Sequence, residues 1–276
     1  MTYLQFHLVF LLPPILLLAW AAWRDRGSWA GTLAATGAPA RWALGTIVLL
    51  ALLWTTPWDN YLVYREVWGY PPGRVLATIG YVPVEEYAFF LLQPILTGLF
   101  LFHLARRDAR RGAGPAQVPH ATGVAVRTVS TAFWLAVAAA GAGMIVAGAS
   151  WTYLGLILAW AAPIAALQTA VAGHRLWAWR RLAATSIVVP TAYLWIADRI
   201  AIGAGIWWIS EPLTTGVHLV GLPIEEATFF LMTNLIVAQG LVAFLDMGPD
   251  LIRRLRARWL RRAADGDPHA APHATP

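Results

Sequence analysis

Long apolar runs separated by short polar segments dominate the pattern along the chain. A membrane-spanning helix needs about 20 mostly apolar residues to cross roughly 30 Å of hydrocarbon, and seven runs are long enough. The pattern therefore predicts an all-α polytopic membrane protein with about seven transmembrane helices. The predicted spans are Tyr3–Trp23, Arg41–Trp58, Val82–Phe102, Thr128–Ala149, Thr152–Ala172, Ala183–Ile202 and Val217–Leu245.

One polar motif occurs twice inside these apolar runs. The segment PVEEYAFFL at residues 83–91 matches PIEEATFFL at residues 223–231 in the proline, both glutamates and the final Phe-Phe-Leu. Upstream, Asp59 precedes Trp68 by nine residues, and Asp198 precedes Trp207 by nine. Two patterns in the same register indicate an internal duplication.

The duplication predicts two three-helix repeats. A single span between the copies gives both the same orientation, so the repeats should be parallel and related by a pseudo-two-fold axis along the membrane normal. The predicted domains are a first unit (1–103), a cytoplasmic linker with a connecting transmembrane helix (104–150), a second unit (151–246), and an Arg-rich amphipathic stretch with a disordered tail (247–276).

The basic residues give the expected orientation. All 20 are arginine, and alternating the loops along the chain places 17 on one side and 3 on the other. Because arginine is retained in cytoplasmic loops, we expect the N-terminus outside and the C-terminus inside. No basic segment precedes the first span, which we expect to be an uncleaved anchor. The net charge of +6 follows from this asymmetry and from contact with membrane lipids, so nucleic-acid binding is not expected.

Composition narrows the chemistry further. The chain is 59% hydrophobic and 12% charged and has no cysteine, which excludes disulfides and thiol catalysis. Its 20 basic residues include no lysine, which excludes a retinal Schiff base. Histidine spacings typical of metal sites are absent, and the glycine pairs in AGAGM and IGAGI lie in spans as packing residues. We therefore expect neither a metal nor a cofactor.

The paired glutamates are the strongest candidates for chemistry. Proline suits the first helical position, so the helices should begin at Pro83 and Pro223, with both glutamates of each pair in the first turn. Stabilisation by the helix dipole is one interpretation. A functional site is the other, because ionisable residues within a span are costly. Desolvation and like-charge proximity would keep a proton on one glutamate of a pair and provide a general acid.

Aromatic and polar residues near the motifs are candidate supporting groups. Aromatic faces can stabilise a cation without capturing it, although lipid-facing Phe and interfacial Trp are also common. The candidate catalytic residues are Glu85, Glu86, Glu225 and Glu226, and we expect Glu→Gln at Glu85 or Glu225 to abolish the activity without loss of the protein. The candidate supporting or substrate-binding residues are Asp59, Asp198, Phe89, Phe90, Phe229, Phe230, Trp68, Trp207, Gln93 and Asn234.

The tandem motifs in a duplicated three-span unit resemble the membrane-integral lycopene cyclases, in the form that fuses two units in one chain. The resemblance covers residues 1–246 and is strongest at 55–102 and 194–245. It implies a redox-neutral, acid-catalysed cyclisation of the acyclic ends of lycopene or a related carotenoid to β-type rings through a carbocation. The substrate would come from the lipid phase, and the resemblance leaves open association with other carotenoid-biosynthesis enzymes.

Two other functions are compatible with the residues alone. A proton-coupled transporter could use intramembrane glutamates, and a non-catalytic protein could bind carotenoid or lipid. Conversion of lycopene to a ringed pigment of identical mass would distinguish the cyclase from both. The sequence leaves open which glutamate donates the proton, and whether the repeats form one site or two.

Overall fold

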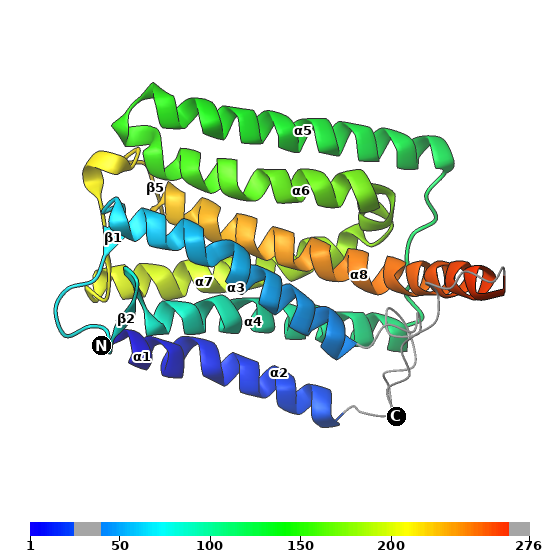
Figure 1. Ribbon diagram of the computed structural model, residues 1–276. Helices are drawn as coiled ribbons and strands as arrows, with labels where there is room; N and C mark the ends of the chain where they lie inside the picture. The colour runs from blue at the N-terminus through cyan, green and yellow to red at the C-terminus, as the bar shows by residue number, and fades with distance from the viewer. Residues whose placement is uncertain (25–39, 265–276) are drawn as a thin grey trace.

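The computed structural model describes residues 1–24 and 40–264, and over these ranges the chain forms a bundle of helices lying side by side (Figure 1). Seven helices in the described part are long and apolar enough to cross a membrane. The prediction of an all-α, seven-span membrane protein is therefore confirmed.

The helices are longer than the predicted spans. They are α1 (Tyr3–Phe6), the π-helical η1 (His7–Leu11), α2 (Leu12–Arg24), α3 (Ala40–Tyr64), α4 (Val84–Arg110), α5 (His120–Ala147), α6 (Thr152–Ala178), α7 (Arg180–Gly203) and α8 (Ile224–Ala264), with short 3-10 turns η4 (Ala149–Trp151) and η5 (Glu211–Leu213).

Because the helices are longer, two predicted segments are shorter or absent. The predicted cytoplasmic linker between α4 and α5 is reduced to residues 111–119. The Arg-rich stretch from Asp250 continues α8 as one helix instead of forming a separate element. Of the predicted disordered tail, residues 265–276 lie outside the described residues.

A small β-hairpin, which the apolar pattern did not predict, precedes each motif helix. Strand β2 (Thr78–Ile79) pairs with β3 (Val82–Pro83), and β5 (His218–Leu219) pairs with β6 (Leu222–Pro223). The prediction that the last span begins at Val217 is thus wrong, because its first residues form the second hairpin. Short apolar runs fit a strand as well as a helix.

The hairpins also shift the helix starts by one residue. Pro83 has an extended conformation, with φ −60° and ψ 149°, and acts as the N-cap of α4. It pairs with Thr78 in the hairpin, so it cannot also adopt helical dihedral angles. The helices therefore begin at Val84 and Ile224, not at the prolines.

A third ladder joins the two halves of the chain directly. Strands β1 (Trp68–Gly69) and β4 (Trp208–Ile209) are antiparallel, with Gly69 opposite Trp208. A Cβ atom at Gly69 would lie 2.5 Å from the Trp208 ring, so glycine is required for this close approach. Figure 1 places these strands and the hairpins at one end of the bundle.

The motif helices α4 and α8 form the centre of the bundle. Helix α4 packs on α2, α3, α7 and α8, and α8 packs on α3, α6 and α7 as well. Helix α5 lies along α6 at the edge of the bundle (Figure 1). There, a Cβ atom at Gly141 would lie 2.7 Å from the Ala159 backbone nitrogen, as the predicted packing role requires. The prediction is wrong for the other three glycines of the two pairs, because Gly143 and Gly203 have no neighbouring atoms within 4 Å of such a Cβ, and Gly205 lies in the turn after α7 with φ 61°.

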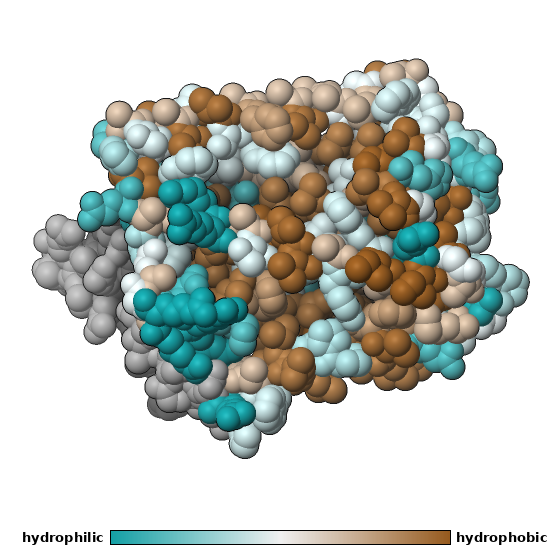
Figure 2. Space-filling model, turned by 180° about the vertical axis from the view of Figure 1, so that it is seen from behind, coloured by the Kyte–Doolittle hydropathy of each residue, from teal (hydrophilic) through white to brown (hydrophobic). Residues whose placement is uncertain are grey.

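The outer surface suits a lipid environment. Many large apolar side chains are exposed, including Leu16, Leu53 and Ile196. Figure 2 shows hydrophobic residues across the middle of one face, with the largest hydrophilic group toward one end of the bundle.

Candidate active site

The two glutamates of each motif have different partners, although they are adjacent in the first turn of α4 or α8. The first glutamate binds the loop before the hairpin: the Leu76 N–H donates to Glu85 Oε1 at 2.9 Å. The N–H and hydroxyl of Thr215 both donate to Glu225 Oε1 at 2.7 Å. Glu85 and Glu225 are buried, and they fix the preceding loops to the helix starts.

The second glutamate of each motif instead lines a small cavity in the bundle. Tyr3 and Tyr70 donate hydrogen bonds from their hydroxyls to Glu86 Oε2, at 2.6 and 2.7 Å. Tyr153 donates to Glu226 Oε1 at 2.6 Å. Both carboxyl groups line the same cavity of about 40 Å³, which is the size of a water site. The two motifs thus contribute to one site.

The loop tyrosine at this cavity remains a hydrogen-bond donor. Burial raises the pKa of the Tyr70 phenol well above its ordinary value, and the neighbouring carboxyl groups of Glu86 and Asp59 raise it further. Tyr70 therefore stays protonated at neutral and moderately alkaline pH, and it keeps its bond to Glu86.

The two repeated aspartates lie beside the paired glutamates. Asp59 and Asp198 are each 1% exposed, and each interacts electrostatically with both Glu86 and Glu226. Asp198 lines the cavity and accepts a hydrogen bond from Trp207 Nε1 at 3.1 Å. Within the described residues, no three His, Asp or Glu side chains are arranged to hold a metal ion.

The repeated tryptophans connect the halves of the chain around the cavity. The Trp68 ring packs on Tyr153 with centroids 5.3 Å apart, and the Trp207 ring packs on Tyr3 at 5.0 Å. Each tryptophan therefore contacts a tyrosine of the other half of the chain, and that tyrosine binds the second glutamate of its own half. Both tryptophans line the cavity, as the supporting role predicted from sequence requires.

The motif phenylalanines separate this polar cavity from a larger apolar one. Phe89 and Phe229 line both cavities, Phe230 lines the polar one, and Phe90 lines the apolar one. Phe229 stacks on Trp58 at 5.9 Å with an interplanar angle of 5°. Phe89 meets Phe230 edge to face at 6.1 Å. The carboxyl groups and the apolar cavity are thus one layer of aromatic rings apart.

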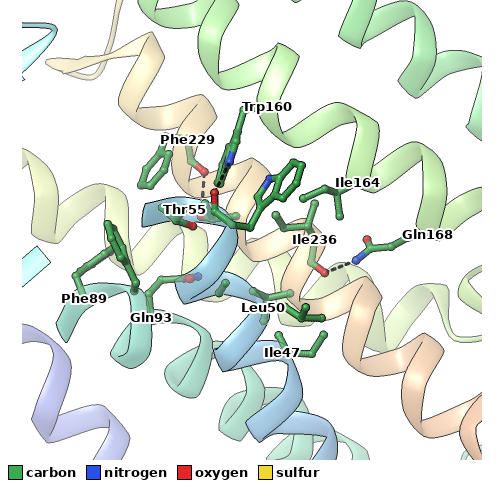
Figure 3. Close-up of a pocket in the computed structure, with 15 residues that line it drawn as sticks. Ile47, Leu50, Thr55, Phe89, Gln93, Trp160, Ile164, Gln168, Phe229 and Ile236 are labelled. Atoms are coloured by element: carbon green, nitrogen blue, oxygen red, sulfur yellow. Dashed lines mark hydrogen bonds between the residues drawn. The ribbon is translucent and has the colours of Figure 1, made fainter. Parts of the chain in front are cut away.

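The larger cavity has a volume of about 200 Å³ and lies between α3, α4, α6 and α8 (Figure 3). Its wall is almost entirely apolar, with Ile47, Leu50, Ile164 and Ile236 among the lining residues. An apolar cavity of about 150 Å³ can hold benzene. A branched hydrocarbon end group is therefore a suitable occupant.

Gln93 and Asn234 belong to a buried network beside this cavity. Gln93 Nε2 donates to Asn234 Oδ1 at 2.8 Å, and Thr97 also donates to that oxygen. Asn234 Nδ2 donates to Thr191 Oγ1 at 3.1 Å. Only Gln93 of the predicted amide pair lines the cavity, whereas Asn234 contacts Gln93 behind the cavity wall and joins α4, α7 and α8.

Three tyrosines at the site were not among the residues predicted from sequence. Tyr3 and Tyr153 occupy matching positions near the start of each repeat, before a proline ten residues later, so the repeat itself contained the signal. Tyr70 had no such signal, because Ile209 occupies the matching position after the second repeated tryptophan.

Comparisons with known proteins show what the chain is similar to in sequence. Lycopene beta-cyclase of Halobacterium salinarum is 40% identical to the chain over 211 residues, which are 73% of this chain and 81% of the relative. The bifunctional lycopene cyclase/phytoene synthase of Podospora anserina is 36% identical over 214 residues, covering 73% of this chain and 35% of that protein. No protein-family profile matches the chain, and no solved structure is similar to it. The identity to the Halobacterium protein over most of its length establishes that the chain belongs to the lycopene cyclase family.

Proposed function

We propose that the chain is a lycopene cyclase of carotenoid biosynthesis that converts an acyclic end of lycopene to a β-type ring. The relatives carry that activity in their names. The observation that supports it in this chain is the convergence of Glu86 and Glu226, one from each motif, on a single cavity with aromatic walls.

The reaction needs an acid, a base and protection from water. Protonation of the terminal double bond gives a tertiary cation, and the neighbouring alkene attacks it to form the ring carbon–carbon bond. Loss of a ring proton then forms the ring double bond. One proton enters and one leaves, so the product has the mass of the substrate, and no oxidant or reductant is consumed.

The hydrogen bonds support different roles for the two cavity glutamates. Glu86 accepts from two phenols, which favour its carboxylate form and suit it to accept the ring proton. Glu226 accepts from one phenol only, so its carboxylate form is less stabilised by hydrogen bonds than that of Glu86, and it is better suited to donate a proton. We assign Glu226 as the acid and Glu86 as the base, with Glu85 and Glu225 as positioning residues.

The aromatic layer suits the cationic intermediate. The faces of Phe89, Phe229 and Trp207 can stabilise positive charge by cation–π interaction, and none of them is a nucleophile. The apolar cavity beyond them limits access of water, which would otherwise capture the cation.

We also propose that the site is composite and formed by two three-helix units. Tyr3 and Tyr153, Asp59 and Asp198, and the two hairpins occupy matching positions in them. The β1–β4 ladder joins the units, with α5 as the connecting helix. Since α4 and α8 continue past residues 103 and 246, unit boundaries at the ends of these helices are more natural than those predicted.

We propose that the hairpin end of the bundle faces outward and the arginine-rich end faces the cytoplasm. Because the chain has no cysteine, single cysteines can test this. We expect Ser150→Cys to react with an impermeant maleimide in intact cells and Gly114→Cys to react only after lysis. The reverse pattern would contradict the orientation and leave the enzyme assignment intact.

Expression in a bacterium that accumulates lycopene tests the function. We expect ringed pigment of unchanged mass from the natural chain and none from the Glu86→Gln/Glu226→Gln double variant. Glu211→Gln, at an exposed glutamate, is the matched control and should cyclise normally. Unchanged lycopene with the natural chain present in the membrane would refute the cyclase and leave the transporter or a non-catalytic binder.

A further inference from the structure

The apolar cavity is reached from the lipid-facing side of the bundle. Leu50 and Trp54 of α3 line it and are 55% and 50% exposed. Ile164 of α6 faces them across the gap, and Figure 3 shows it on the opposite wall from Leu50. A molecule in the membrane could therefore reach the cavity between α3 and α6 without crossing water.

The matching gap on the other side of the bundle lies between α7 and the N-terminal helix, and it is filled. The Tyr193 hydroxyl donates to the Phe10 carbonyl at 2.7 Å across this gap, and the matching pair is also bonded across the gap between α3 and α6, where Trp160 Nε1 donates to the Trp54 carbonyl at 3.4 Å. Phe10 lies in the π-helical turn η1, where the backbone is locally widened.

Side-chain size distinguishes the gap between α7 and the N-terminal helix from the gap between α3 and α6. Counting from the repeated aspartates, Leu194 matches the cavity-lining Thr55, and Leu194 is only 1% exposed. Leu194 packs in one buried cluster with Leu11 and Ile15 of the N-terminal helix. The duplication thus provides two equivalent gaps, of which one is packed with apolar side chains.

We propose that the polyene enters laterally from the lipid through the opening between α3 and α6, lined by Leu50, Ala51, Trp54 and Ile164, and through this side alone. The inference rests on the proposed cyclase function. The end group occupies the apolar cavity, its terminal double bond reaches Glu226 past Phe89 and Phe229, and the rest of the chain stays in the membrane.

The asymmetry supplies a matched pair of variants. Leu50 and Val189 occupy equivalent positions nine residues before the repeated aspartates and are 55% and 46% exposed. We expect Leu50→Trp to lower ring formation at least tenfold, because the indole fills the opening. Val189→Trp should stay within twofold of the natural chain. The amount of each protein in the membrane is measured alongside.

Reversible chemical modification of a cysteine at the opening tests the route in protein that has already folded. In the cysteine-free chain, Leu50→Cys is treated with benzyl methanethiosulfonate in membranes and assayed with added lycopene, and Val189→Cys is the control. We expect modification to abolish ring formation by Leu50→Cys alone, and dithiothreitol to restore it.

Each outcome bears on one hypothesis. If fully labelled Leu50→Cys cyclises normally, or if labelled Val189→Cys is the one blocked, the lateral route is overturned while the cyclase function stands. If the unmodified natural chain forms no ring, the function itself fails.

Discussion

The two motif regions have the same backbone design and different surroundings. In both, a hairpin leads into a helix, the first glutamate binds the preceding loop, and the second lines the shared cavity. The difference lies in the partners of the second glutamate. Glu86 has two phenol donors, whereas Glu226 has one phenol and Asp198.

This comparison teaches how a duplicated site can acquire two roles. A symmetric pair of glutamates would give two equivalent acids, but the reaction needs one proton donor and one acceptor. Tyr70 donates to Glu86, whereas its counterpart Ile209 has no hydroxyl to donate, and this is one source of the difference between the two environments. The following variants test the distinction.

Loss of the acid should have the largest effect. Glu226→Gln cannot donate a carboxylic proton, so we expect ring formation to fall by about 10²–10⁴-fold, the usual contribution of a general acid. Pigment extraction from lycopene-producing cells measures it, with Glu211→Gln as control. Activity within threefold of the natural chain would show that Glu226 is not the acid.

Loss of the base should change the product as well as the rate. With Glu86→Gln the cation can still form, but the proton is then lost to another acceptor. We expect about 10²-fold slower ring formation, the lower end of the usual contribution of a general base, and a new mixture of ring double-bond positions, identified by NMR of the purified pigment. Unchanged product ratios at a reduced rate would argue against Glu86 as the base.

Removal of a positioning glutamate should affect stability first. Glu225 accepts two hydrogen bonds and Glu85 accepts one from the loop before each hairpin. Each bond to a charged group contributes about 1.5–3 kcal/mol, so Glu225→Ala should lower the Tm in detergent more than Glu85→Ala. Equal Tm values for both variants and the natural chain would show that Glu85 and Glu225 do not stabilise the loops.

The loop tyrosine should have the smallest effect. Tyr70→Phe leaves Glu86 with one phenol donor, as Glu226 has, at a cost of about 1 kcal/mol. We expect a fivefold slower reaction and a partial shift of ring double-bond positions toward those of Glu86→Gln. A Tyr70→Phe enzyme identical to the natural one in rate and product would mean that the second phenol does not distinguish the glutamates.

The seven spans, the paired glutamates and the repeated aspartates and tryptophans could be predicted because apolar length and the repeat are sequence patterns, whereas the three tyrosines at the cavity were missed. The direction of each glutamate could not. Adjacent residues on a helix point about 100° apart, so Glu85 and Glu86 must face different surroundings. Which of them faces the cavity depends on how α4 is rotated against its neighbours, and that is set by tertiary packing.

The hairpins were missed for a different reason. Residues 217–223 are mostly apolar and directly precede α8, so the apolar pattern includes them in the same predicted span. Their turn residues Val220 and Gly221 have φ of 52° and 81°. The Val-Gly pair is a weak turn signal, since valine rarely adopts such a conformation.

The crossed aromatic contacts make each half of the molecule depend on the other. Trp68 covers a tyrosine of the second half, and Trp207 covers a tyrosine of the first. Neither half alone would have a complete wall around its own carboxyl group. A single continuous chain therefore guarantees the halves in a one-to-one ratio, and no half is made in excess with an unshielded acid in the membrane.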